Sequence, residues 1–529
     1  MNLASVTPKP APGKKWLRIM AMFVVLLLVL PTADMIWVRV WRDIPIGYAT
    51  TRLTGPLRSD GLVNYAAALD SKYSRGVTAE NNAVPLLIQA TGVPATYHAA
   101  LSKAYQKQLF SRLHIIMPVP QSGFHSYYQW VSLKLGNNLS NTQWNMEITH
   151  VDPAFRLHPW TEKEFPLAAK WIHANARAFR ILHEAVKRPR YYLPLVHFHY
   201  INAETPFLAN FRAAASALAA RAMFRLGHGN IRGATADIDD ALRLATLMSQ
   251  SPSLMARLSA ESVDILVLQA EGTAVGTGLL TRGELEDLSR HTVPHSAILP
   301  LTAQLNFQRY DGLAFLERAS RYGIRTLIAD FNVKSPNGPP LPPPLSAKIL
   351  DAMIPINFAA TMRRKNQFYD HSLMAMNHKS YLQRKIALHH LYQYVIRSTS
   401  GHPLRQWINP VDAQLPILAR SMPSFFNTFP EELLMRRRIT LLAVALAIYK
   451  LAHGQYPQRL SALAPHYNKK IPIDGFTGNP LKYHLLNHGQ SFLLYSVGPN
   501  GVDNGGTGAG MHNDSRDESL FLRTSGPIQ

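Results

Sequence analysis

The chain contains pairs of histidines of the kind that can bind a metal ion or move a proton. His197 and His199 are separated by one residue, and His389 is followed directly by His390. Neither pair has an acidic residue close by, and neither matches the His-Glu-x-x-His spacing of a zinc-binding helix. Chance pairs are expected among 22 histidines. We therefore interpret both pairs as packing or surface residues.

Acidic and hydroxyl side chains give no stronger indication of catalysis. Asp237, Asp239 and Asp240 lie on one expected amphipathic helix, where Asp237 and Asp240 face the same way. We interpret these carboxylates as a solvated helix face. Ser496 ends an expected strand without the Gly-x-Ser-x-Gly pattern of a nucleophile elbow. The chain also has no Walker loop and no Gly-x-Gly-x-x-Gly segment, so no catalytic residue and no organic cofactor is predicted.

The composition is typical of a globular protein without cysteine chemistry. Hydrophobic residues make up 47% of the 529 residues, which is enough to build substantial cores. A chain of this length suggests about two to four domains. The absence of cysteine excludes disulfides, cysteine-ligated zinc, iron–sulfur clusters and thiol catalysis.

The chain is strongly basic, with a net charge of +22 from 55 Lys and Arg against 33 Asp and Glu. A field of this sign attracts polyanions such as nucleic acid, anionic lipid or acidic glycan. A nucleic-acid-binding protein usually concentrates its basic residues on one stripe or helix. Here they are spread widely, with only short clusters at 188–190, 363–365 and 436–438. We therefore expect a generally basic protein and no nucleic-acid partner.

The N-terminal segment predicts a membrane anchor. Residues 1–15 are basic and contain no acidic residue, and an unbroken apolar run extends from Ile19 to Leu30. Residues 16–35 are long enough to cross a bilayer, with the N-terminus cytoplasmic by the positive-inside rule. The alternative is a signal peptide cleaved after Ala33, although Pro31 would then occupy a position that favours a small residue. The expected location is single-pass in a bacterial inner membrane, with the bulk of the chain periplasmic.

Apolar residues recur at helical spacing through most of the remaining chain. Residues 164–183 predict one amphipathic helix, and 208–226, 231–249 and 254–275 predict three more, separated by Gly and Pro. The predicted divisions are 1–15 (cytoplasmic basic tail), 16–35 (transmembrane signal-anchor), 44–333 (helical body), 334–346 (proline-rich linker), 347–430 (further helices), 431–519 (an α+β module) and 520–529 (tail).

The first two helices of the strongest region have a pattern of small residues. Gly229, Ala234 and Ala241 stand where small side chains let two antiparallel helices approach closely. This pattern resembles one tetratricopeptide unit. A stable array needs at least three repeats, and only one unit with a partial neighbour is present. The fold class implied is therefore a mainly α, antiparallel helical bundle with one tetratricopeptide-like unit.

The C-terminal region has a distinctive order of motifs. A helix over 431–452 ends in the sequence Tyr-Lys-Leu-Ala-His-Gly-Gln-Tyr-Pro, and a short second helix is expected at 460–463. Strands are expected at 481–486 and 491–497, with an Asn- and Gly-containing turn between them that favours a hairpin. A Gly-, Asn- and Asp-rich loop follows at 498–506. Residues 431–519 are therefore predicted to form one module, a long helix packed against a small antiparallel sheet.

Residues 445–506 resemble the globular part of the major pseudopilin of type II secretion, and the whole chain is similar to uncharacterised bacterial membrane-anchored proteins with such a tail. The chain lacks a prepilin peptidase site before its apolar run, so filament assembly does not follow. Because that family binds calcium in the loop after its last strand, the resemblance implies Asp503, Asp514 and Asp517 as calcium ligands. The alternative is a solvated Gly-rich turn.

The sequence therefore predicts a non-enzymatic scaffold or interaction protein. Its expected partners are the membrane and an unidentified envelope protein. The alternative is a periplasmic hydrolase that acts on an envelope polymer. Converging carboxylates or a His–carboxylate pair in a cleft would favour the hydrolase, whereas a groove on the helical layer lined by small and apolar residues would favour the scaffold.

Overall fold

A computed structural model describes the chain over residues 44–93, 103–115, 124–135, 152–195, 205–292, 299–323, 356–399, 410–468, 470–506 and 520–523. The chain divides into two compact units. The first unit comprises residues 1–63, 313–366 and 399–414, and the second comprises 64–312, 367–398 and 415–529. The prediction of a mainly helical chain is confirmed.

In the first unit, side chains from two helices hold the segment that begins at residue 44. The helices are α15 (Leu301–Tyr322) and α18 (Phe358–Met376), which contribute residues to both units. Glu317 accepts a hydrogen bond from the Val63 amide at 2.9 Å. Burial raises the pKa of Glu317 to about 7. Asn366 donates to the carbonyls of Ala49 and Thr50, so backbone polar groups of this segment are satisfied by buried side chains.

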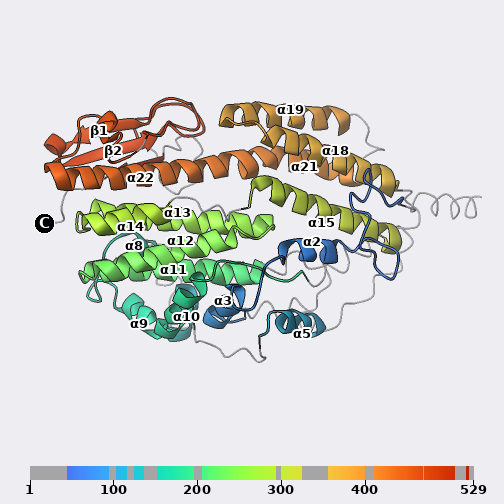
Figure 1. The fold of residues 1–529 in the computed structure, drawn as a ribbon, viewed down its shortest axis with the longest axis horizontal. Helices are drawn as coiled ribbons and strands as arrows, with labels where there is room; N and C mark the ends of the chain where they lie inside the picture. The colour runs from blue at the N-terminus through green and yellow to red at the C-terminus, as the bar shows by residue number, and fades with distance from the viewer. Residues whose placement is uncertain are drawn as a thin grey trace, which may run out of the picture. The chain divides into compact units, whose positions relative to one another are not determined.

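The second unit contains the three helices predicted in the strongest helical region. They are α11 (Thr205–Gly227), α12 (Ile231–Met248) and α13 (Leu254–Gly276), which lie side by side in Figure 1. The other helices of this part are α2 (Tyr65–Tyr73), α3 (Val84–Thr91), α5 (Lys103–Arg112), α6 (Tyr127–Leu135), α8 (Asp152–Leu157), α9 (Pro166–Ala174), α10 (Ala176–Val186) and α14 (Arg282–Thr292).

Small side chains allow α11, α12 and α13 to pack closely. Ala234 and Ala241 of α12 are fully buried, as are several alanines of α11 and α13. Asn230 caps α12 by accepting a hydrogen bond from the Gly233 amide, which supplies one of the donors that a helix start leaves unpaired. At the end of α11, a Cβ on Gly227 would lie 2.0 Å from the Trp160 carbonyl oxygen. Glycine is therefore required where the segment before α9 crosses α11.

The single amphipathic helix predicted over 164–183 is wrong, because the structure has α9 and α10 with a break at Asn175. The Asn175 side chain is buried and is used by the segment before α6. It accepts a hydrogen bond from the His125 amide and donates to the His125 and Trp171 carbonyls. These bonds compete with a continuous helix, as asparagine side chains commonly do.

The C-terminal part is built on a long helix that begins after a π-helical turn. Helix α21 (Pro410–Pro423) leads into the π-helix η4 (Ser424–Thr428), which continues into α22 (Phe429–His453). A 3₁₀ turn, η5 (Leu460–Leu463), follows. The apolar residues of α22 are buried against α13, α14 and the strands. A helix that is apolar on most sides requires cover of this kind.

The predicted hairpin is present. Strands β1 (Lys482–Leu486) and β2 (Ser491–Ser496) pair antiparallel, with Lys482 opposite Tyr495 and Leu486 opposite Ser491. Asn487, His488 and Gly489 take left-handed backbone angles in the turn. A third strand, β3 (Leu520–Arg523), was not expected from the sequence and pairs with β2, giving the order β1-β2-β3.

Asp474 holds the turn before β1 to the end of β2. It is 2% exposed. Its carboxylate accepts hydrogen bonds from the Phe476 amide, the Ser496 hydroxyl and the Val497 amide, at 2.9, 2.8 and 3.0 Å. Because a buried carboxylate needs several donors, this arrangement gives Ser496 a structural role.

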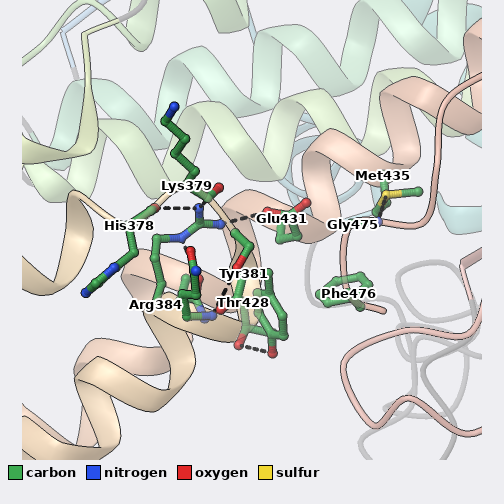
Figure 2. A network of polar contacts seen from close by, with 12 residues as sticks. His378, Lys379, Tyr381, Arg384, Thr428, Glu431, Met435, Gly475 and Phe476 are labelled. Atoms are coloured by element: carbon green, nitrogen blue, oxygen red, sulfur yellow. Dashed lines mark hydrogen bonds and ion pairs between the residues drawn. The ribbon is translucent and has the colours of Figure 1, made fainter. Parts of the chain in front are cut away.

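Arg384 fastens helix α19 (Tyr381–Thr399) to the start of α22, as Figure 2 shows. Its guanidinium donates to Asn427 and to Glu431, both at 2.8 Å, and to the His378 and Lys379 carbonyls. Asn427 lies in the π-helical turn, so the irregular backbone there is stabilised by a charged neighbour.

The same contact extends to the turn that contains Asp474. A Cβ on Gly475 would lie 1.9 Å from a carboxylate oxygen of Glu431. The Gly475 amide contacts the Met435 sulfur, and the rings of Tyr381 and Phe476 pack edge to face with centroids 4.9 Å apart. A side chain at position 475 would therefore displace the Glu431 carboxylate from its present place.

A buried ion pair joins α13 to α22. Arg437 contacts Asp264 at 2.7 Å, and their side chains are 5% and 2% exposed. Burial raises the pKa of Asp264, while the Arg437 guanidinium favours its charged form. Each charge therefore depends on the other to offset the cost of removal from water.

The prediction of a transmembrane helix and signal-anchor is wrong for the chain as described. None of the helices in the described ranges is both long enough and apolar enough to cross a bilayer. The apolar stretch of α22 follows directly on Arg436, Arg437 and Arg438 and is buried within the protein. The predicted segment 16–35 and the predicted linker 334–346 lie outside the described residues. The single-pass inner-membrane location is withdrawn with the anchor.

We expect Ala241→Leu to destabilise the chain by about 1–3 kcal/mol, because added methyl groups overpack a close helix contact. Ala241 is fully buried, whereas Ala236 on the same helix is exposed. The measurement is a chemical unfolding curve for Ala241→Leu beside one for Ala236→Leu, the matched control. Equal stability of the two variants would contradict the close packing of α12.

Replacing Arg437 with Met should cost about 3–5 kcal/mol, because Asp264 would remain buried without its partner. The double variant Asp264→Leu with Arg437→Met should recover most of this loss, since it leaves no charge unpaired. Both are measured by urea unfolding of the full chain. A double variant no more stable than Arg437→Met alone would argue against the ion pair as the cause.

Candidate functional site

A groove of about 300 Å³ lies where α9, α10 and the end of α11 meet. Phe179 and Phe224 are its aromatic residues, and Arg221 and Arg225 are its arginines. The complete lining is Ile172, His173, Ala176, Phe179, Arg221, Phe224, Arg225, His228 and Asn230. The groove therefore combines apolar walls with basic groups, and its lining contains no carboxylate. Such a combination can bind a ligand.

Two arginines of the groove share one buried carboxylate. Asp237 of α12 is 1% exposed. Arg221 binds both of its oxygens, and Arg225 contacts one of them at 2.9 Å through Nη1. Burial raises the pKa of Asp237, and the two guanidinium groups act against this rise by favouring the carboxylate. Asp237 thereby fixes both arginines in position, since a charged buried group tolerates little displacement.

Aromatic rings fix the shape of the groove. The Arg221 guanidinium lies 3.9 Å from the Phe179 ring centroid, a cation–π geometry. Phe224 packs against Trp160, with centroids 4.7 Å apart, and against His228 at 4.4 Å. Because these rings have few rotatable bonds and many neighbours, the apolar walls are rigid.

His228 forms a His–carboxylate pair at the edge of the groove. Its Nδ1 lies 2.8 Å from the Phe224 carbonyl, and its Nε2 contacts a carboxylate oxygen of Glu162. The hydrogen bond to the Phe224 carbonyl is the main cause that raises the pKa of His228, and the Glu162 carboxylate raises it further. Both ring nitrogens therefore have acceptors, and the protonated ring satisfies both.

A second His–carboxylate pair lies nearby, between α10 and α12. His183 Nδ1 is 2.9 Å from a carboxylate oxygen of Asp240, which is 4% exposed. Burial raises the pKa of Asp240, and the His183 hydrogen bond opposes this rise. This pair does not line the groove, so we interpret it as the means by which a buried carboxylate finds a partner.

The polar side chains that line the groove are Arg, His and Asn. Ser, Thr and Lys are absent from its lining residues. His228 already directs both nitrogens at acceptors, so it has no free nitrogen to take a proton from a substrate. Neither carboxylate of the two His pairs lines the groove. His173 also lines the groove, where its ring packs edge to face on Phe224. The arrangement is suited to holding a ligand.

The structure corrects one interpretation of the acidic residues. Asp237 and Asp240 were predicted to be solvated, but both are buried and paired. His389 and His390 are exposed, as expected, whereas His197 and His199 lie outside the described residues. The groove itself was not predicted, because its lining comes from three helices and its arginines lack a contiguous motif.

Of the residues implied as calcium ligands, only Asp503 can be placed; Asp514 and Asp517 lie outside the described residues. Asp503 accepts hydrogen bonds from the Tyr495 hydroxyl at 2.9 Å and contacts Lys482 Nζ at 3.0 Å. The Lys482 contact is the main cause that lowers the pKa of Asp503 to about 2. Within the described ranges, no cluster of three or more His, Asp or Glu could hold a metal ion.

Comparisons with protein-family models, curated proteins and solved structures find no match to this chain.

Calcium binding through Asp503, Asp514 and Asp517 stays a prediction. If these residues bind the ion, calcium should raise the melting temperature of the full chain relative to chelator, because a ligand that binds only the folded state stabilises it. Asp503→Asn should remove the rise, whereas Asp287→Asn, at an exposed position of α14, should leave it unchanged. Identical melting curves with calcium and with chelator would contradict calcium binding.

Proposed function

We propose that this chain is a non-enzymatic scaffold that binds a partner protein in the groove between α9, α10 and α11. The observation that supports this most directly is the nature of the lining. It consists mainly of apolar and basic side chains, of which Arg221 and Arg225 are held by Asp237 and His228 by Glu162. Rigid aromatic and arginine side chains are the residue types that dominate binding energy at protein interfaces.

The layer formed by α11, α12 and α13 supports this function because it fixes the shape of the groove before a partner binds. Arg221 and Arg225 project from α11, which packs most extensively on α12 and α13. Asp237 is held on α12 by burial, so the two arginines are positioned by a packed core. A preformed site loses less entropy on binding than a mobile loop does.

The alternative function, a hydrolase, has in its favour His173 of the lining and the His228–Glu162 pair at the groove edge. That pair is exposed, with side chains 38% and 55% accessible. The second nitrogen of His228 faces the Phe224 carbonyl, and a catalytic histidine needs a nitrogen directed at its substrate. The pair is better suited to add positive charge to the groove edge.

We also propose that α11 and α12 are one tetratricopeptide-like unit, and that residues 431–519 are a module related to the globular part of type II secretion pseudopilins. The unit has its short turn before Ile231 and buried Ala234 and Ala241. The C-terminal order of α22, η5 and the β1–β2 hairpin agrees with the order of motifs in that family. The scaffold would thus combine a binding layer with a second contact module.

The test is site-specific photo-crosslinking in cells that produce the chain. A photo-reactive phenylalanine analogue replaces Ala176, which lines the groove and is exposed. The matched control places it at Ala236, which is exposed on α12 and is not a lining residue. We expect a discrete protein adduct from position 176 and none from 236. Absence of an adduct at 176, or the same adducts at both positions, would contradict the proposed function.

A further inference from the structure

Arg225 has hydrogen-bonding capacity that the described protein does not use. Its Nη1 donates to the Gly233 carbonyl at 2.7 Å and contacts Asp237. The contacts within the described part of the chain leave Nε and Nη2 without an acceptor. The side chain is 30% exposed and lines the groove. A guanidinium presents such donors in a fixed plane, which matches the two oxygens of a carboxylate.

The ionisable side chains that line the groove are all Arg or His. Arg221 and Arg225 share the buried Asp237 carboxylate, and the charge of Asp240, which is paired with a histidine, also acts on Arg225. Protonated His228 is paired with Glu162, which is exposed to solvent. An incoming anion therefore meets basic side chains in a partly buried place, where it is attracted more strongly than at an open surface.

The walls next to Arg225 are apolar. Phe224 precedes it in the chain, and Ala176 and Ile172 belong to the same lining. The volume of about 300 Å³ lies at the lower end of the range of ligand pockets. The groove is thus large enough for a few side chains of an extended segment, and it offers one position for an anion and an adjoining one for an apolar group.

We propose that the groove recognises a short acidic segment of a partner protein, in which a carboxylate binds Arg225 and a neighbouring apolar side chain packs on Phe224. This rests on the proposed function and names the partner's chemistry. The carboxylate occupies Nε and Nη2, while Asp237 retains Nη1. Charge complementarity favours this occupant, because the described lining contains no acidic side chain that would repel it.

The experiment is selection of a displayed library of random short peptides against the full chain, followed by binding measurements by fluorescence anisotropy. Enriched peptides should contain Asp or Glu next to an apolar residue. Changing that Asp to Asn, or Glu to Gln, in the best peptide should weaken binding roughly tenfold to a hundredfold, the usual effect of losing a charge-assisted hydrogen bond. The protein is unchanged in this comparison, so its folding does not affect the result.

Two protein variants locate the contact. Arg225→Gln should weaken binding by the same factor, whereas Arg232→Gln, on the exposed side of α12, should leave it unchanged. Thermal unfolding of both variants verifies that they fold. Failure to enrich any peptide, enrichment without acidic residues, or equal binding by the two variants would overturn the proposal. If one of these results is found together with a crosslinked partner at position 176, the scaffold function is still supported. Only the proposal of an acidic segment is then rejected.

Discussion

The close approach of α11, α12 and α13 is the constraint on which the second unit depends. Fully buried alanines bring these helices together, and helices at short separation leave no room for solvent between polar side chains. Acidic residues on α12 and α13 are nevertheless enclosed there, among them Asp237 and Asp264. Asp237 and Asp264 are each paired with an arginine of a neighbouring helix, because an unpaired buried carboxylate costs several kcal/mol.

The cations come from different helices. Arg221 and Arg225 reach Asp237 from α11, and Arg437 reaches Asp264 from α22. One result is attachment of the C-terminal helix and its sheet to the helical layer. The other is the groove, because two arginines were placed on one carboxylate and the second retains unused donors. Core packing and the binding site thus arise from the same requirement to pair buried charge.

The sequence predicts the regular elements well and the site poorly. Helices α11 to α13 follow from apolar periodicity, and the hairpin follows from its Asn- and Gly-containing turn. Asp237 was misread because an acidic residue at helical spacing looks the same whether water or Arg221 faces it. The break at Asn175 depends on His125, which is distant in sequence. Each error concerns a tertiary partner that local pattern does not reveal.

The net charge of +22 and the positive charge of the groove are different properties. Arginines that pair with buried acids, such as Arg221 and Arg437, cancel charge and add nothing to the outer field. The excess comes from exposed Lys and Arg, whose attraction for anions salt screens within about 8–10 Å. Arg225 is partly buried, and its contact with a carboxylate would be directional and less screened. Salt should therefore suppress diffuse binding of polyanions more strongly than binding of an acidic segment in the groove, which separates general basicity from recognition.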